Sequence, residues 1–129
     1  MIVVDTHAVI WLTQDQGQLS GAAGSALIEA RREGRLAIAD ITLREIAAQS
    51  VRGRLTVSPS LEVYLRFIES QFMVLPINGE IAERSARFGS LYPKDPADRL
   101  IGATALIHGA RLVTKDVLIR ASGEVECIW

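Results

Sequence analysis

The feature that most constrains the fold is a set of five short apolar runs, each three to five residues long. Each run is too short for a helix and lacks the strict polar alternation of a strand with one face in water. Strands of this kind are typical of parallel sheets, because helices cover both faces of such a sheet. The runs are Ile2–Val4, Leu36–Ala39, Met73–Ile77, Leu112–Thr114 and Val125–Ile128.

The segments between these runs carry helix start and stop signals. Ser20 is a good N-cap for a helix over residues 22–33, which Gly34 can end. Ser58 is predicted to cap another helix, with Pro59 at its first position. Further helices are expected from Asp40 or Thr42 to about Val51, from Asn78, and from Asp95 to Gly109. Strands that alternate with helices predict an α/β fold, a mostly parallel central sheet flanked by helices, in a single domain over residues 1–129.

Composition excludes several classes of protein. No apolar run approaches the roughly 20 residues of a membrane span, and the start of the chain lacks the basic residues of a signal peptide. A single cysteine, Cys127, cannot form an internal disulfide, which suits a cytoplasmic protein. The net charge of −1 does not itself predict nucleic-acid binding, although 12 of the 14 basic residues are Arg, the side chain that grips phosphate best.

Acidic residues stand where the predicted strands end. Asp5 and Asp116 follow strands, and Glu45 and Asp98 lie in the first turns of helices that can pack over the same edge. Ligands of open α/β sheets bind beyond the carboxyl ends of the strands, so these acids are expected to converge there. Clustered carboxylates suit Mg²⁺ or Mn²⁺, and such a centre is well suited to phosphodiester hydrolysis.

Each acid also has a structural interpretation. Thr42 to Glu45 is a good capping box, and Asp95 to Asp98 resembles one. Asp116 suits a turn, and Asp40 is interpreted as a helix cap. Asp5 is the hardest to explain structurally, because an acid directly after a buried strand needs partners.

Four segments of the sequence resemble the motifs of PIN-domain proteins, in particular VapC-type toxins, over essentially the full length of the chain. The third is the most specific, and all four occur in the family's order with suitable spacing. They are residues 4–11 (VDTHAVIW), 41–47 (ITLREIA), 95–105 (DPADRLIGATA) and 112–116 (LVTKD).

The resemblance implies a PIN-like three-layer fold and a metal-dependent endoribonuclease, the toxin of a type II toxin–antitoxin pair. It implies Mg²⁺, with Mn²⁺ as a substitute, and RNA as the substrate. It also implies a homodimer and a cognate VapB-type antitoxin that blocks the site. Thr114 matches the family's polar residue beside the last acid. The resemblance places catalytic roles on Asp5, Glu45, Asp98 and Asp116, and metal binding on Asp5, Asp98 and Asp116.

Other functions fit less well. A phosphoacceptor receiver domain needs an acidic pair after its first strand, and a haloacid-dehalogenase-type phosphatase needs Asp-x-Asp, but Asp5 is followed by Thr6 and His7. A non-catalytic module that binds RNA or a partner on the same fold is the main alternative, and an intact set of acids argues against it.

A helical stripe offers a candidate partner surface. Most of the stripe is expected to be core, but its apolar residues exceed what one sheet face obviously needs, so we expect part of it, with Trp11 and Leu12, to bind the antitoxin. The stripe consists of Leu61, Tyr64, Leu65, Ile68 and Phe72.

Overall fold

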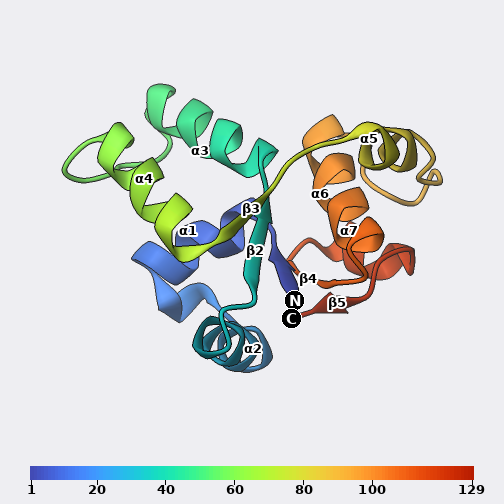
Figure 1. The fold of residues 1–129 in the computed structure, drawn as a ribbon, viewed down its shortest axis with the longest axis horizontal. Helices are drawn as coiled ribbons and strands as arrows, with labels where there is room; N and C mark the ends of the chain where they lie inside the picture. The colour runs from blue at the N-terminus through green and yellow to red at the C-terminus, as the bar shows by residue number, and fades with distance from the viewer.

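The computed structural model describes residues 1–129, and its centre is a sheet of five parallel strands in the order β3-β2-β1-β4-β5 (Figure 1). β1 is the middle strand, with Ile2 beside Leu36 of β2 and Arg111 of β4. The sheet confirms the predicted α/β class. The strands are β1 (Ile2–Val4), β2 (Leu36–Ala39), β3 (Met73–Leu75), β4 (Arg111–Val113) and β5 (Cys127–Ile128).

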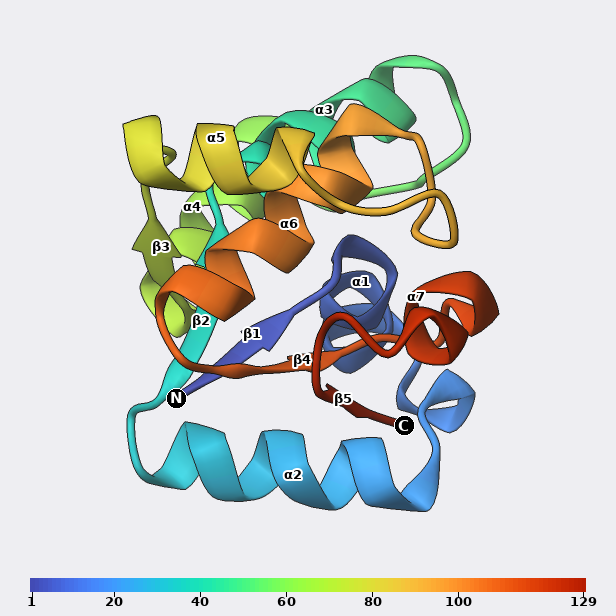
Figure 2. The same cartoon turned by 90° about the vertical axis from the view of Figure 1, so that its right-hand side faces the viewer.

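Helices lie on both sides of this sheet, as Figures 1 and 2 show. They are α1 (Thr6–Gln14), α2 (Gly21–Arg32), α3 (Ile41–Val51), α4 (Leu61–Gln71), α5 (Gly79–Ala86), α6 (Pro96–Ile107) and α7 (Val117–Ser122), with a short 3₁₀ turn at Gln16–Gln18. Ser20 and Asn78 cap α2 and α5 as predicted, through bonds to the backbone N–H groups of Ala23 and Ile81. No helix is both long enough and apolar enough to cross a membrane.

Two apolar cores hold the layers together, one on each face of the sheet. Val4 and Ile38 belong to the core under α1, α2 and α4, whereas Val3 and Ala37 belong to the core under α5, α6 and α7. Neighbouring residues of one strand therefore serve opposite faces, which explains why the strands are apolar throughout. α3 contacts both α4 and α6, so it joins the two layers at the carboxyl edge of the sheet.

Three local predictions were wrong. α4 begins at Leu61 and is capped by Ser60, whose hydroxyl accepts a bond from the backbone N–H of Val63, so Ser58 is not its cap. α7 was missed, because its six residues are too few to show a periodic pattern. The stripe on α4 is mainly core, as expected, but the docking surface expected there is wrong at Tyr64, Ile68 and Phe72, which are at most 6% exposed.

Candidate active site

All four predicted acids line one cavity of about 410 Å³ at the carboxyl edge of the sheet. Asp5 ends β1, Glu45 comes from α3, Asp98 from the first turn of α6, and Asp116 from the start of α7. The remaining lining residues are Thr6, His7, Trp11, Asp95 and Lys115. The structure therefore brings together residues that lie up to 111 positions apart in the sequence (116 − 5).

Asp5 is the deepest of the acids, with 7% of its surface exposed. Its Oδ1 accepts a bond from the backbone N–H of Thr6 at 2.8 Å, and its Oδ2 accepts one from the Thr114 hydroxyl at 2.7 Å. Desolvation by burial raises the pKa of Asp5, although these two bonds oppose the shift. Both oxygens are thus fixed in place at the bottom of the cavity.

Glu45 does not form the predicted capping box. Thr42 is buried within the first turn of α3, and no side chain caps that helix. Instead, the hydroxyl of Thr6 donates to Oε1 of Glu45 at 2.5 Å. Burial raises the pKa of Glu45, and the negative charges of Asp5 and Asp95 raise it further. Thr6 therefore links two acids, through its backbone to Asp5 and through its side chain to Glu45.

Asp98 has no hydrogen bond to its carboxylate, whereas Asp95 caps α6 through a bond to the backbone N–H of Ala97. Desolvation by burial is the largest cause that raises the pKa of Asp98 to about 7. Repulsion from Asp5, Asp95, Glu45 and Asp116, in decreasing order, adds to that shift. The capping interpretation of Asp98 is therefore wrong, and this carboxylate is free to take a ligand.

Asp116 combines a structural contact with a place in the cavity. Its Oδ1 accepts a bond from the backbone N–H of Ile119 at 2.9 Å and so caps α7. Its own backbone N–H donates to the hydroxyl of Thr114, which in turn donates to Asp5. Thr114 thus sets the relative position of two candidate ligands.

The cavity has a large excess of negative charge. None of its acids takes part in a salt bridge, and its only Lys or Arg, Lys115, lies over the ring of Trp11 at 5.4 Å. Carboxylate oxygens around a cavity open to solvent are the donors that Mg²⁺ and Mn²⁺ prefer, so this donor set fits such an ion. The side chains do not form a closed coordination group of three or more ligands in their present rotamers.

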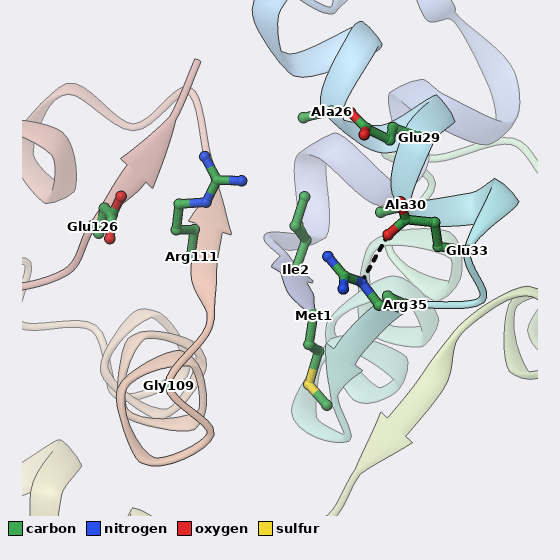
Figure 3. Close-up of a pocket in the computed structure, with 10 residues that line it drawn as sticks. All are labelled: Met1, Ile2, Ala26, Glu29, Ala30, Glu33, Arg35, Gly109, Arg111 and Glu126. Carbon is green, nitrogen blue, oxygen red and sulfur yellow. Dashed lines mark ion pairs between the residues drawn. The ribbon is translucent and has the colours of Figure 1, made fainter.

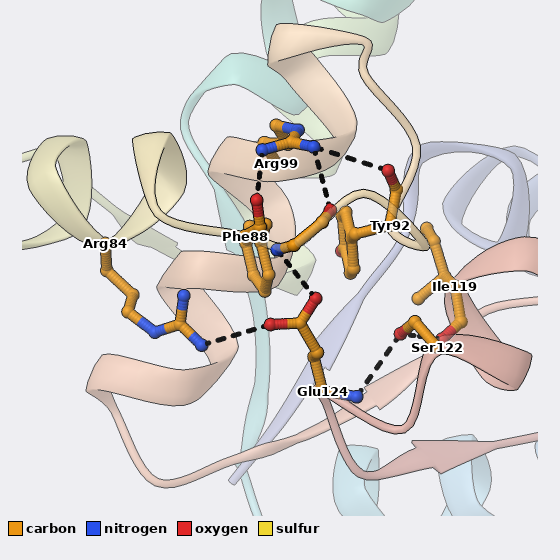
Figure 4. A network of polar contacts seen from close by, with 8 residues as sticks. Arg84, Phe88, Tyr92, Arg99, Ile119, Ser122 and Glu124 are labelled. Atoms are coloured by element: carbon orange, nitrogen blue, oxygen red, sulfur yellow. Dashed lines mark hydrogen bonds and ion pairs between the residues drawn. The ribbon is translucent and has the colours of Figure 1, made fainter.

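A polar network that sequence reasoning missed holds the start of α6 in place (Figure 4). The guanidinium of Arg99 donates to four backbone carbonyls, those of Phe88, Gly89, Tyr92 and Pro93. The hydroxyl of Tyr92 donates to the carbonyl of Asp98 at 3.1 Å. Arg99 directly follows Asp98 in the most specific motif, residues 95–105. This position was the only feature of the sequence that could have indicated its role.

The same network extends to the far side of the loop between α5 and α6. Glu124 accepts a bond from the backbone N–H of Gly89 and forms an ion pair with Arg84, whose guanidinium lies 4.5 Å from the centre of the Phe88 ring. Phe88 in turn stacks on Tyr92 at 3.9 Å. The turn that bears Asp98 is therefore supported by packing and hydrogen bonds of residues that do not line the cavity.

A different cavity, of about 390 Å³, lies at the amino edge of the sheet (Figure 3). Glu29, Glu33 and Glu126 line it together with Arg35 and Arg111, and Arg35 pairs with Glu33 at 3.0 Å. None of the predicted site residues lies there.

Comparison with known proteins gives consistent results. Residues 2–121 match the PIN domain family. The sequence is 33% identical over 120 residues to Ribonuclease VapC22 of Mycobacterium tuberculosis, and the alignment covers 93% of this chain and 90% of that protein.

Two solved structures extend the comparison. A chain of a toxin–antitoxin complex from Klebsiella pneumoniae superposes with a TM-score of 0.63 and 25% identity, over 90% of this chain and 87% of that one. A chain of VapBC2 from Rickettsia felis, bound to a DNA fragment from its promoter, has a TM-score of 0.72 and 15% identity, over 98% and 97%. The second likeness concerns the fold alone.

Proposed function

Because the chain belongs to the PIN domain family, we propose that it is a metal-dependent endoribonuclease, the toxin of a VapBC-type toxin–antitoxin pair. The observation that carries the proposal is the convergence of Asp5, Glu45, Asp98 and Asp116 in one cavity without a paired cation. The relative named ribonuclease supports RNA as the substrate. A purely structural role does not account for so much uncompensated charge in one place.

The acids are assigned separate tasks. Asp5, Asp98 and Asp116 would hold Mg²⁺, or Mn²⁺ in its place. When bound, the ion lowers the pKa of a water and neutralises charge on the phosphate. Thr6 and Thr114 keep the oxygens of Asp5 directed at the cavity, and the network around Arg99 keeps Asp98 there.

Glu45 is proposed to handle the proton of the attacking water. Its Oε1 is held by the hydroxyl of Thr6, which leaves Oε2 for a water molecule. Its raised pKa makes the carboxylate a better proton acceptor than an exposed Glu would be.

The test is cleavage of single-stranded RNA by the purified protein with Mn²⁺ or Mg²⁺. We expect cleavage with either ion and its complete loss in EDTA, with recovery when the ion is returned in excess. A protein that binds RNA but never cleaves it under these conditions would instead be a non-catalytic module on the same fold.

The solved toxin–antitoxin relative supports the proposal of a cognate antitoxin. We propose that this antitoxin acts by blocking the acidic cavity. We also propose a homodimer of single-domain subunits that acts on RNA in the cytoplasm. Co-expression with the product of a short neighbouring reading frame is expected to give a tight complex with little nuclease activity. If the complex forms but cleaves RNA as fast as the free toxin, the antitoxin does not act at the acidic cavity.

A further inference from the structure

A larger groove, of about 610 Å³, adjoins the acidic cavity, and the only charged residues of its lining that the cavity does not share are arginines. The two hollows share His7, Glu45 and Asp95, so they form one continuous depression. Arg44 and Arg52 of α3 and its C-cap, together with Arg54 in the loop that follows, line the new groove. Acidic and basic surfaces thus meet at Glu45.

These three Arg side chains are exposed, and none of them has a carboxylate partner or a side-chain hydrogen bond. Five other arginines are engaged: those at positions 35, 66, 84 and 87 form ion pairs, and Arg99 binds carbonyls. Arg31, Arg32, Arg111 and Arg120 are also unpaired, so what distinguishes the three groove arginines is that they line one hollow next to the acidic cavity. Like charges gathered in one groove repel each other unless an anion neutralises them. The groove is therefore suited to an anionic ligand.

The adjoining acids restrict what this anion can be. An acidic peptide would gain from the Arg groove, but its carboxylates would be repelled from the carboxylates next to it. A phosphodiester chain suits both parts, because its phosphates can bind the guanidinium groups while one phosphate reaches the metal-binding acids.

Trp11 provides a further reason to expect a single strand. Its half-buried ring lines the acidic cavity beside His7, at 5.8 Å between ring centres, and Lys115 lies over it. Unpaired bases stack on aromatic side chains, whereas the bases of a duplex are not available for such contact.

We propose that Arg44, Arg52 and Arg54 form the track along which a single RNA strand enters the acidic cavity. The inference rests on the proposed nuclease function and adds to it the path of the substrate. These arginines are positioning residues: they bind backbone phosphates on one side of the cut and touch no reacting atom. Their loss should weaken RNA binding and raise KM, with little effect on kcat.

The experiment uses Arg52→Gln/Arg54→Gln and a matched control, Arg31→Gln/Arg32→Gln. The control removes the same charge from the end of α2, which lies on the other side of the molecule from α3 (Figure 2). Binding of a fluorescein-labelled single-stranded RNA is followed by anisotropy in Mg²⁺ as salt is varied. All proteins also carry Asp98→Asn, so that the RNA is not consumed.

We expect Arg52→Gln/Arg54→Gln to weaken binding on the order of tenfold. The slope of log K against log salt should become shallower by about 1.4, since each phosphate contact with a single strand contributes about 0.7. The control should stay within about twofold of the parent, as expected for charges far from the ligand. With Asp98 restored, KM should rise for the groove variant while kcat is retained.

The proposal is overturned if the groove variant binds like the parent, if the control loses as much, or if the parent binds no RNA. Tighter binding of duplex than of single-stranded RNA would also overturn it. If the protein cleaves RNA normally but the groove variant binds RNA like the parent, the proposed nuclease function stands and only the track is refuted. If the protein binds RNA through these arginines but never cleaves it, the proposed nuclease function is contradicted, whereas the proposed RNA path along the Arg groove is supported.

Discussion

The two edges of the sheet carry cavities of similar size, about 410 Å³ at the carboxyl edge and 390 Å³ at the amino edge, but the balance of acidic and basic residues differs between them. At the amino edge, three Glu side chains face two Arg side chains, and one pair is closed at 3.0 Å. At the carboxyl edge, five carboxylates face one Lys. Charged residues that line a cavity are therefore uninformative by themselves. A candidate site is indicated instead by carboxylates that no nearby Lys or Arg neutralises.

The difference also appears in what supports each cavity. Asp5 is fixed by two hydrogen bonds at the bottom of the carboxyl edge, and Asp98 is carried by a turn that Arg99 and Tyr92 hold in place. The Arg35–Glu33 pair of the amino edge joins two side chains that are 61% and 43% exposed. The acids of the carboxyl edge are thus held by buried contacts, as a site that places ligands for chemistry requires, whereas the pair at the amino edge is not.

The largest effect is expected from Asp98→Asn. Asn keeps the size of the side chain but removes the charge that a metal ion needs, so RNA cleavage should fall on the order of a thousandfold or more. The measurement is the initial rate of RNA cleavage in Mn²⁺, with circular dichroism to confirm the fold. Glu29→Gln at the amino edge is the matched control and should cleave RNA at the parent rate. Equal rates for both variants would contradict the assignment of the site.

Gly102→Ala is expected to destabilise the fold while leaving the acids in place. A Cβ at Gly102 would lie 2.1 Å from the hydroxyl of Tyr92, which packs there to reach the carbonyl of Asp98. Overpacking of this kind costs about 1–3 kcal/mol of unfolding free energy.

The control for Gly102→Ala is Gly24→Ala in α2, where nothing lies within 4 Å of the added Cβ. Ala is the better helix former, so this variant should gain up to about 1 kcal/mol. Urea denaturation of both variants measures the difference. Equal stabilities would show that Tyr92 can move away from α6 without cost.

The metal-free protein should lose stability as pH rises. The folded pKa of Asp98 is about 7 against an ordinary 3.8, so the folded state holds a proton that the unfolded state has already released. The stabilisation is complete below the unfolded pKa and is lost as pH rises through the folded one. Urea denaturation in EDTA at about pH 5 and about pH 8 tests this, and the change with pH should be smaller in Asp98→Asn. An identical pH dependence in that variant would mean that Asp98 is not the group responsible.

Much of the fold could be predicted because its signals are local. Apolar strands, the Ser20 and Asn78 caps and the acids at strand ends are each determined by a few adjacent residues. The rule that ligands bind at the carboxyl edge then brought Asp5, Glu45, Asp98 and Asp116 together without any distance information.

The failures involve contacts between distant segments. Glu45 was compatible with a capping box until Thr6, 39 positions away, proved to be its partner. The α4 stripe was compatible with an exposed face until the core of α1, α2 and β2 covered it. The four carbonyls bound by Arg99 belong to an irregular loop, and no periodic pattern indicates where such carbonyls point.

The smallest effect is expected from Arg35→Gln at the amino edge. The variant breaks the ion pair with Glu33, but both side chains are largely in water, where such a pair contributes between zero and about 1 kcal/mol. We expect the unfolding free energy to change by less than about 0.5 kcal/mol, and less still at high salt, which screens the pair. RNA cleavage should be unchanged, because the cavity at this edge shares no residue with the acidic one. A clear loss of cleavage at unchanged stability would show that the amino edge also contacts RNA, and the contrast between the two edges would no longer hold.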